Sequence, residues 1–197
     1  MKKDIILAGV GGQGILSIAA IIGTAAVKAG LYLKQAEVHG MSQRGGDVQS
    51  NLRISDDPIA SDLIPVGKAD LIISVEPMEA LRYVPMLSSE GWIITNTTSF
   101  INIPDYPAHE AIMEEIKKQP FHITLDAEVI AKEIGSVKCA NVVILGAATP
   151  FLGLSYTQIE DAIRVMFGRK GEEMVNMNLA ALEAGNEQAK QQIKQIR

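Results

Sequence analysis

The feature that most constrains the fold is a glycine-rich turn, GVGGQG at residues 9–14, between a predicted strand and a predicted helix. Residues 4–8 (DIILA) form a largely apolar run, which is typical of a parallel strand buried on both faces. Residues 15–29 are rich in alanine, isoleucine and leucine and lack proline, which predicts a buried helix ending near Gly30. Residues 31–38 predict a second strand. Together these segments predict a βαβ unit with a right-handed crossover.

The alternation of strands and helices continues along the chain. Residues 48–54 (VQSNLRI) alternate apolar and polar side chains, which predicts a half-exposed, antiparallel strand near an edge of the sheet. Further strands are predicted at 69–75, 91–96 and 121–125, and helices at 77–84, 107–118, 127–134 (capped by Asp126), 141–148, 157–167 (capped by Thr157) and 171–197.

This order predicts a three-layer, Rossmann-like α/β fold, with a mostly parallel sheet and helices on both faces. We expect a single domain over residues 1–197. Its C-terminal helical segment, at about 155–197, is expected to pack on the domain or on a partner.

Composition narrows the class of protein. The chain has 197 residues, of which 47% are hydrophobic and 21% charged, values typical of a globular protein and not of a disordered one. The net charge of −5 argues against a nucleic-acid partner. No apolar run approaches the roughly 20 residues that span a bilayer, so no membrane segment is expected, and residues 1–9 are interpreted as a strand and not a signal peptide.

The number of cysteines excludes metal sites that need several thiolate ligands from this chain. Cys139 is the only cysteine, so this chain cannot hold a four-thiolate iron–sulfur cluster or a structural zinc site. A small buried hydrophobic role is its default interpretation. The absence of an internal disulfide fits a reducing, cytoplasmic setting.

The glycine-rich turn is the first candidate binding site. We expect Gly9 to allow the tight turn, Gly11 to let a ligand approach the backbone, and Gly14 to let the helix pack closely on the strand. Free N–H groups at a helix N-terminus attract phosphates and other anions. A nicotinamide site would also need an acid ending the second strand, for which Glu37 is the nearest candidate. The alternative is a tight turn that binds no ligand.

A second glycine-rich loop follows the second strand, Ser42-Gln43-Arg44-Gly45-Gly46. The guanidinium of Arg44 offers a fork of donors suited to phosphate or carboxylate. Ligands of doubly wound sheets bind outside the carboxyl ends of the strands, so both loops are expected at one edge. A flexible hairpin connection with a solvated arginine is the alternative.

Weaker candidates follow other strands at the same predicted edge. Glu76 could face a ligand or favour the N-terminus of the following helix, and Asn96, Thr97 and Thr98 could line a site. No nucleophile–base pair stands out along the chain. The sequence therefore predicts no self-sufficient catalytic group, and no catalytic or metal-binding residue is assigned.

The pairing of GVGGQG at residues 9–14 with HGMSQRGG at residues 39–46 resembles the gamma domain of the 2-oxoacid:ferredoxin oxidoreductases. The sequence of the second loop is most similar to that of the corresponding loop in the small subunits that act on indolepyruvate. The similarity extends to residues 60–82, to Asn96-Thr97 and to residues 141–146.

The resemblance implies that this chain is one subunit of a larger enzyme and is inactive on its own. It implies a large partner subunit that holds thiamine diphosphate and iron–sulfur clusters, oxidises an aryl pyruvate with loss of carbon dioxide, and reduces ferredoxin. The acyl group leaves on coenzyme A, which this chain is a candidate to contact. The residues that match the family loops are Gly9, Gly11, Gly12, Gln13, Gly14, Ser42, Gln43, Arg44, Gly45 and Gly46.

Two other functions remain open at this point. One is a stand-alone Rossmann oxidoreductase that binds a nicotinamide or flavin nucleotide, with Glu37 on the ribose. The other is a non-catalytic, partner-binding subunit whose glycine-rich loops are purely structural. Substrate range, complex stoichiometry and the residues that contact coenzyme A cannot be read from the sequence.

Overall fold

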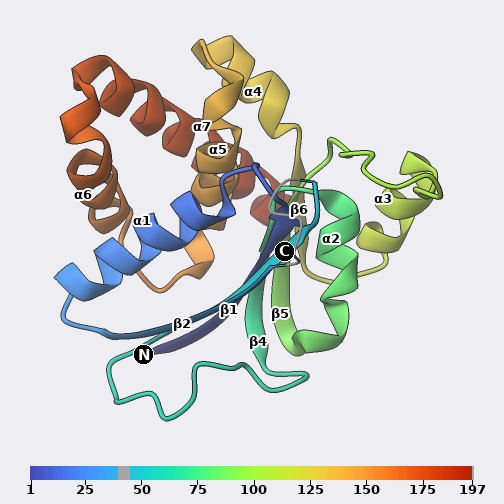
Figure 1. Cartoon of the computed structure of the whole chain (residues 1–197), viewed down its shortest axis with the longest axis horizontal. Coiled ribbons are helices and arrows are strands. Elements are labelled where there is room, and N and C mark those ends of the chain that lie inside the picture. The colour runs from blue at the N-terminus through green and yellow to red at the C-terminus, as the bar shows by residue number, and fades with distance from the viewer. Residues whose placement is uncertain (40–44, 197) are drawn as a thin grey trace.

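A computed structural model describes residues 1–39 and 45–196 (Figure 1). Its strands are β1 (Lys2–Val10), β2 (Tyr32–His39), β3 (Asp47–Ser55), β4 (Ala69–Ser74), β5 (Leu87–Asn96) and β6 (His122–Leu125). Its α-helices are α1 (Ile15–Lys28), α2 (Pro77–Arg82), α3 (His109–Lys117), α4 (Ala127–Ile134), α5 (Ala140–Ala148), α6 (Tyr156–Phe167) and α7 (Glu172–Ile196). The predicted helix at 141–148 is thereby confirmed.

The strands form one six-stranded sheet in the order β2-β3-β1-β4-β5-β6. β1, β4, β5 and β6 pair in parallel, whereas β3 is antiparallel to both β1 and β2. Since β2 is antiparallel to β3, it runs in the same direction as β1. The parallel relation predicted for the βαβ unit is confirmed, but β3 lies between its two strands. Five strands therefore end at the same edge of the sheet.

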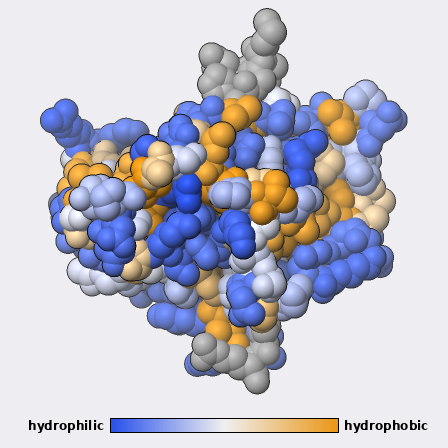
Figure 2. Space-filling view, turned by 90° about the horizontal axis from the view of Figure 1, so that it is seen from below, coloured by the Kyte–Doolittle hydropathy of each residue, from blue (hydrophilic) through white to orange (hydrophobic). Residues whose placement is uncertain are grey.

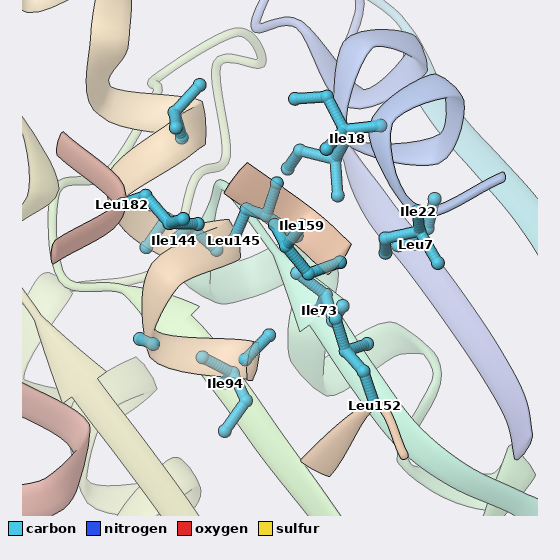
Figure 3. Packing of buried hydrophobic residues seen from close by; sticks show 14 of the residues in the cluster. Leu7, Ile18, Ile22, Ile73, Ile94, Ile144, Leu145, Leu152, Ile159 and Leu182 are labelled. Carbon is cyan, nitrogen blue, oxygen red and sulfur yellow. The ribbon is translucent and has the colours of Figure 1, made fainter. Parts of the chain in front are cut away.

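Helices cover both faces of the sheet, as the predicted three-layer fold requires (Figure 1). The larger core lies under α1 and α4–α7, and includes Leu7 beside Ile22 of α1, with Ile73, Ile94 and Ile144 of α5 farther along the sheet (Figure 3). The smaller core lies on the opposite face, under α2 and the segment that follows it. Neighbouring strand residues such as Ile72 and Ile73 face opposite cores, the pattern of a sheet buried on both sides.

The polar residues of β3 show why its predicted exposure was wrong. The strand is antiparallel as predicted and lies one position in from the edge strand β2, but Ser50–Ser55 are all buried. Arg53 makes a bidentate ion pair with Asp4, at 2.7 and 3.2 Å, and donates to the carbonyl groups of Ser61 and Leu63. The alternation therefore marks a hydrogen-bonded polar layer covered by the 56–68 loop, and not a solvated face.

The side of the molecule seen from below mixes hydrophilic and hydrophobic residues (Figure 2). The 56–68 loop runs along the lower side in Figure 1 and exposes Leu63 and Val66. Among the described residues, no helix is both long enough and apolar enough to cross a membrane.

The C-terminal helices pack on this chain, which resolves one alternative left open by the sequence. α5 is buried along nearly its whole length between the sheet and α7. At the crossing, a Cβ on Gly146 would lie 2.1 Å from the carbonyl oxygen of Leu182, and a Cβ on Gly185 would lie 1.9 Å from that of Val143. The two helices thus meet backbone to backbone.

The N-cap of helix α6 lies two residues before the predicted one. Ser155, and not Thr157, is its N-cap: the Ser155 hydroxyl accepts from the Gln158 N–H at 3.2 Å, and the Gln158 side chain accepts from the Ser155 N–H at 2.7 Å. This reciprocal capping box satisfies the N–H groups of Ser155 and Gln158, which would otherwise have no partner at the start of the helix. Asp126 caps α4 as predicted. The assignment of residues 1–197 to a single domain stays a prediction.

We predict that Gly185→Ala destabilises the fold by about 3 kcal/mol, because a backbone carbonyl cannot move aside as a side chain can. Denaturant unfolding measures this change. Gly168→Ala is the matched control, since its Cβ would meet nothing within 4 Å and its φ of −53° suits alanine. Equal stability of the two variants would contradict the proposed backbone contact.

Candidate functional site at the carboxyl edge of the sheet

The two glycine-rich loops meet at the edge where the parallel strands end. The Gly11 N–H donates to the carbonyl of Gly46 at 2.8 Å, and the Gly45 N–H donates to the carbonyl of Gly11 at 3.4 Å. The predicted proximity of the loops is therefore confirmed for Gly45 and Gly46. Ser42, Gln43 and Arg44 lie outside the described residues.

Two glycines of the turn have roles that differ from those predicted. Gly9 lies inside β1, where a Cβ would come within 2.5 Å of the Val75 side chain and 2.6 Å of the Ile15 side chain. Gly9 therefore serves close packing and not the turn. The turn itself falls at Gly12, whose φ of +102° favours glycine. The backbone of Gly11 is occupied by the second loop, so it is not the predicted point of ligand approach.

Gly14 packs closely, but against α5 and not against β1 as predicted. Its φ is +83°, and a Cβ here would lie 2.5 Å from Nδ2 of Asn141. That same Nδ2 donates to the Gly14 carbonyl at 3.1 Å. Gly14 is also the N-cap of α1 and offers no capping side chain. In the first turn of α1 the Ser17 N–H donates to the Gly14 carbonyl at 3.1 Å, whereas the N–H groups of Ile15 and Leu16 have no partner among the described residues and keep their capacity for an anion.

Gln13 stabilises the turn with its own side chain. Its Oε1 accepts from the Val10 N–H at 2.8 Å, and its backbone N–H donates to the Val10 carbonyl at 3.1 Å. The side-chain carbonyl therefore replaces a backbone acceptor at the end of β1. This contact gives Gln13 a structural role in shaping the candidate site.

Two cavities flank the glycine-rich turn and share Gly12 and Gly14. The larger, about 550 Å³, lies between the turn and helices α4, α5 and α7. Its lining includes Ser17, Lys138, Asn141, Lys170, Met174 and Asn178. The smaller, about 420 Å³, lies on the β2 side of the turn and is lined by Ile15, Leu16, Glu37 and Val48 among others.

The larger cavity is the better match to an anionic ligand. Lys138 and Lys170 supply positive charge beside the N-terminus of α1, and Glu128 is the acidic residue in the lining. Met174, Met177 and Phe167 give an apolar surface. Cys139 lines this cavity but is 2% exposed, and burial raises the pKa of its thiol, so it remains a protonated, unreactive group.

Glu37 reaches the smaller cavity, yet its setting argues against a ribose site. In a dinucleotide-binding fold the strand that carries this acid lies next to β1. Here β3 separates β2 from β1. The Glu37 carboxylate also accepts from the Gln35 side chain at 2.6 Å.

Glu76 and Asn96 end their strands at this edge, but both are built into the protein. Glu76 is fully buried, and its carboxylate caps α2 by accepting from the Glu79 N–H at 2.8 Å. Asn96 is 3% exposed, donates to the Val75 carbonyl at 3.3 Å and accepts from the Ala127 N–H at 3.0 Å. The Thr98 hydroxyl donates to Asp126 at 3.3 Å. Glu76 and Thr98 thus shape the edge, whereas Asn96 also lines the larger cavity, as expected for a residue that lines a site.

Three further residues at the edge were not singled out from the sequence. Asn141 fixes Gly14, Asn102 donates to the carbonyl of Gly45 at 2.9 Å, and Tyr106 donates to the carboxylate of Glu76. Asn141 lies in the stretch that carries the family resemblance, which is a signal that could have found it. Asn102 and Tyr106 lie in an irregular segment whose spacing carries no signal.

A model of the pyruvate ferredoxin/flavodoxin oxidoreductase family matches residues 4–188. The chain belongs to this family. It is 39% identical to the indolepyruvate oxidoreductase subunit IorB of Archaeoglobus fulgidus, over 96% of both chains. It is also 39% identical to the subunit of the same name from Pyrococcus horikoshii, over 98% of this chain and 99% of the relative. The resemblance seen in the sequence is thus confirmed.

The fold is also that of a solved structure. The 2-oxoglutarate:ferredoxin oxidoreductase from Magnetococcus marinus, determined with 2-oxoglutarate, coenzyme A and succinyl-CoA bound, matches with a TM-score of 0.78 at 22% identity. The match covers 96% of this chain and 31% of that one. At this identity the likeness establishes the fold alone.

We predict that three of the four tyrosines lose their protons late. Burial raises the pKa of Tyr83 and of Tyr156 to about 12, and burial together with the hydrogen bond to Glu76 raises that of Tyr106. Unfolded phenols titrate near pH 10, so the folded chain binds more protons between pH 10 and 12, and the free energy of unfolding falls as pH rises through that range. Phenolate absorbance of folded and denatured protein measures this. Four phenols titrating near pH 10 in the folded chain would contradict the burial described.

Proposed function

We propose that this chain is the small subunit of an indolepyruvate, or more broadly aryl pyruvate, ferredoxin oxidoreductase. The observation that carries the proposal is the pair of glycine-rich loops joined at Gly11 and Gly46, in a chain 39% identical to indolepyruvate oxidoreductase subunits over nearly its whole length. The active enzyme is then a hetero-oligomer with a large partner subunit, and residues 1–197 act as one domain within it in the cytoplasm. We expect no turnover by this subunit alone.

The division of labour follows from what the chain contains. When bound in the partner subunit, thiamine diphosphate and iron–sulfur clusters supply the decarboxylation and the path for electrons to ferredoxin. This chain has one cysteine, buried at position 139, which fits clusters held elsewhere. Its own contribution is to bind, to orient and to exclude water at the edge of the sheet.

The residues of the larger cavity fit coenzyme A. The phosphates of that cofactor need positive charge and N–H donors, which Lys138, Lys170 and the N-terminus of α1 provide. The methionines and Phe167 offer an apolar wall for the uncharged part of the molecule. On sequence grounds, the guanidinium of Arg44 adds a donor fork for a phosphate or for the substrate carboxylate.

The two alternative functions receive less support. A stand-alone nucleotide-dependent oxidoreductase needs Glu37 beside β1, which the insertion of β3 prevents. A purely structural role for the glycine-rich loops leaves unexplained the cavity with two lysines beside an uncapped helix N-terminus.

The proposal is tested on the complex formed by co-expressing the chain with its large partner subunit under anaerobic conditions. We predict that indolepyruvate drives ferredoxin reduction that depends on coenzyme A. Arg44→Ala should raise KM for coenzyme A or for the 2-oxoacid by about 10-fold or more, the range expected for a charge-assisted hydrogen bond. Arg164→Ala, an exposed arginine on α6, is the control and should leave both constants unchanged.

Two outcomes would contradict this account separately. An intact complex that oxidises no aryl pyruvate would overturn the proposed activity. Activity that Arg44→Ala leaves unchanged at every concentration of coenzyme A and 2-oxoacid would overturn the ligand role of the second loop.

A further inference from the structure

The segment between β5 and α3, residues 97–108, is held at the carboxyl edge by a buried carboxylate. Both oxygens of Glu76 are used: Oε2 accepts from the Glu79 N–H at 2.8 Å, and Oε1 accepts from the Phe100 N–H at 3.2 Å and from the Tyr106 hydroxyl. Glu76 is fully buried, so these bonds are shielded from water and stronger than exposed ones. We call residues 97–108 the anchored segment.

Packing contributes little to the position of the anchored segment. Its large apolar residues, Phe100, Ile101 and Ile103, are all exposed, and none belongs to either hydrophobic core. Hydrogen bonds therefore carry most of the constraint, those to Glu76 together with the bond from the Thr97 N–H to the Leu125 carbonyl at 3.0 Å and that from Thr98 to Asp126 at 3.3 Å. A change at the outer side of the segment should accordingly leave the cores intact.

Asn102 links the anchored segment to the second glycine-rich loop. Its Nδ2 donates to the Gly45 carbonyl at 2.9 Å. Gly45 in turn donates to the carbonyl of Gly11, and Gly11 donates to that of Gly46. Glu76 thus fixes Phe100 and Tyr106 on either side of Asn102 in the chain, and hydrogen bonds lead from Asn102 through Gly45 to the glycine-rich turn beside α1.

The oxygen of the Asn102 side-chain amide takes no part in the link to Gly45. This atom, Oδ1, is buried and accepts no hydrogen bond from the described part of the chain. Within the described residues, the amide of Asn102 is therefore engaged through its donor, in the bond to Gly45.

We propose that Asn102 is a positioning residue for the site at the glycine-rich turn. The proposal rests on the proposed function, since it concerns how that site recognises its anionic ligand. Asn102 touches Gly45 and not the ligand. It holds Gly45 and Gly46 against Gly11, and Glu76 and Tyr106 hold the segment from which it acts.

The experiment compares Asn102→Ala, Asn102→Asp and Ile101→Ala in the complex of this chain with its partner. Asp keeps the size of Asn but has no N–H to donate and adds a charge, whereas Ala removes the donor without adding a charge, so an effect that both variants share is assigned to the lost hydrogen bond. Ile101 is the control, because it lies next to Asn102 in the same segment and its side chain is 76% exposed. Amide hydrogen exchange, read by mass spectrometry, follows peptides covering residues 9–14 and 45–50, and steady-state kinetics give KM for coenzyme A and kcat.

Both changes at Asn102 should speed exchange in these peptides by about five-fold, the effect of one neutral hydrogen bond. They should raise KM for coenzyme A by a similar factor while kcat stays within about two-fold. Ile101→Ala should alter neither readout. Tyr106→Phe, which removes one bond to Glu76, should move both readouts in the same direction by less.

Three results would overturn the proposal. Amide exchange at the wild-type rate in both Asn102 variants would show that the hydrogen bond from Asn102 to Gly45 does not hold the second glycine-rich loop. Wild-type behaviour of Asn102→Asp alone would show that packing, and not the donor, matters. Faster exchange with unchanged KM in an active complex would reduce Asn102 to a structural role. A complex inactive with every 2-oxoacid would instead show failure of the proposed function, while the exchange data would still decide whether the link exists.

Discussion

The close contact between α5 and α7 is the constraint on which the rest of the structure depends. Gly146 and Gly185 let the two backbones meet, and a side chain at either position would strike a carbonyl oxygen. The contact seats α5 against the sheet and places Asn141, near its N-terminal end, on the carbonyl of Gly14. Gly14 caps α1, so the position of the α1 N-terminus, and of the cavity beside it, follows from a helix crossing made by the last part of the chain.

Most of the polar side chains described at the carboxyl edge of the sheet are engaged in hydrogen bonds within the protein. Glu76 and Asn96 are buried and hydrogen-bonded to backbone groups of neighbouring elements, and Gln13 completes the turn. What remains for a ligand is backbone N–H groups, the positive end of α1 and the side chains of Lys138 and Lys170. Such a set binds and orients an anion but supplies neither a nucleophile nor a redox centre. This is the chemistry expected of a subunit that supports a partner's cofactors.

Local signals predicted most of the elements, because periodicity, caps and glycines act over a few residues. The glycine-rich turn, the buried helix α5 and the Asp126 cap were predicted correctly on that basis. Position in the sheet depends on distant partners: β3 was predicted to be half-exposed because nothing in residues 48–54 reveals that Asp4 and the 56–68 loop cover Arg53. The roles of Gly9 and Gly14 were misassigned for the same reason, since their close neighbours are Val75 and Asn141. At the site, the meeting of the two loops was predictable from topology, whereas Asn102 and Tyr106 act through tertiary contacts that no spacing encodes.

The central claim is that this chain works as the small subunit of a larger oxidoreductase. The most direct measurement is an anaerobic pull-down of the tagged chain from its native host, with mass spectrometry of what co-purifies and a visible absorption spectrum. The account predicts a large, cysteine-rich partner chain and the broad absorbance of iron–sulfur clusters. A lone, colourless chain that binds a nicotinamide or flavin nucleotide tightly would contradict it.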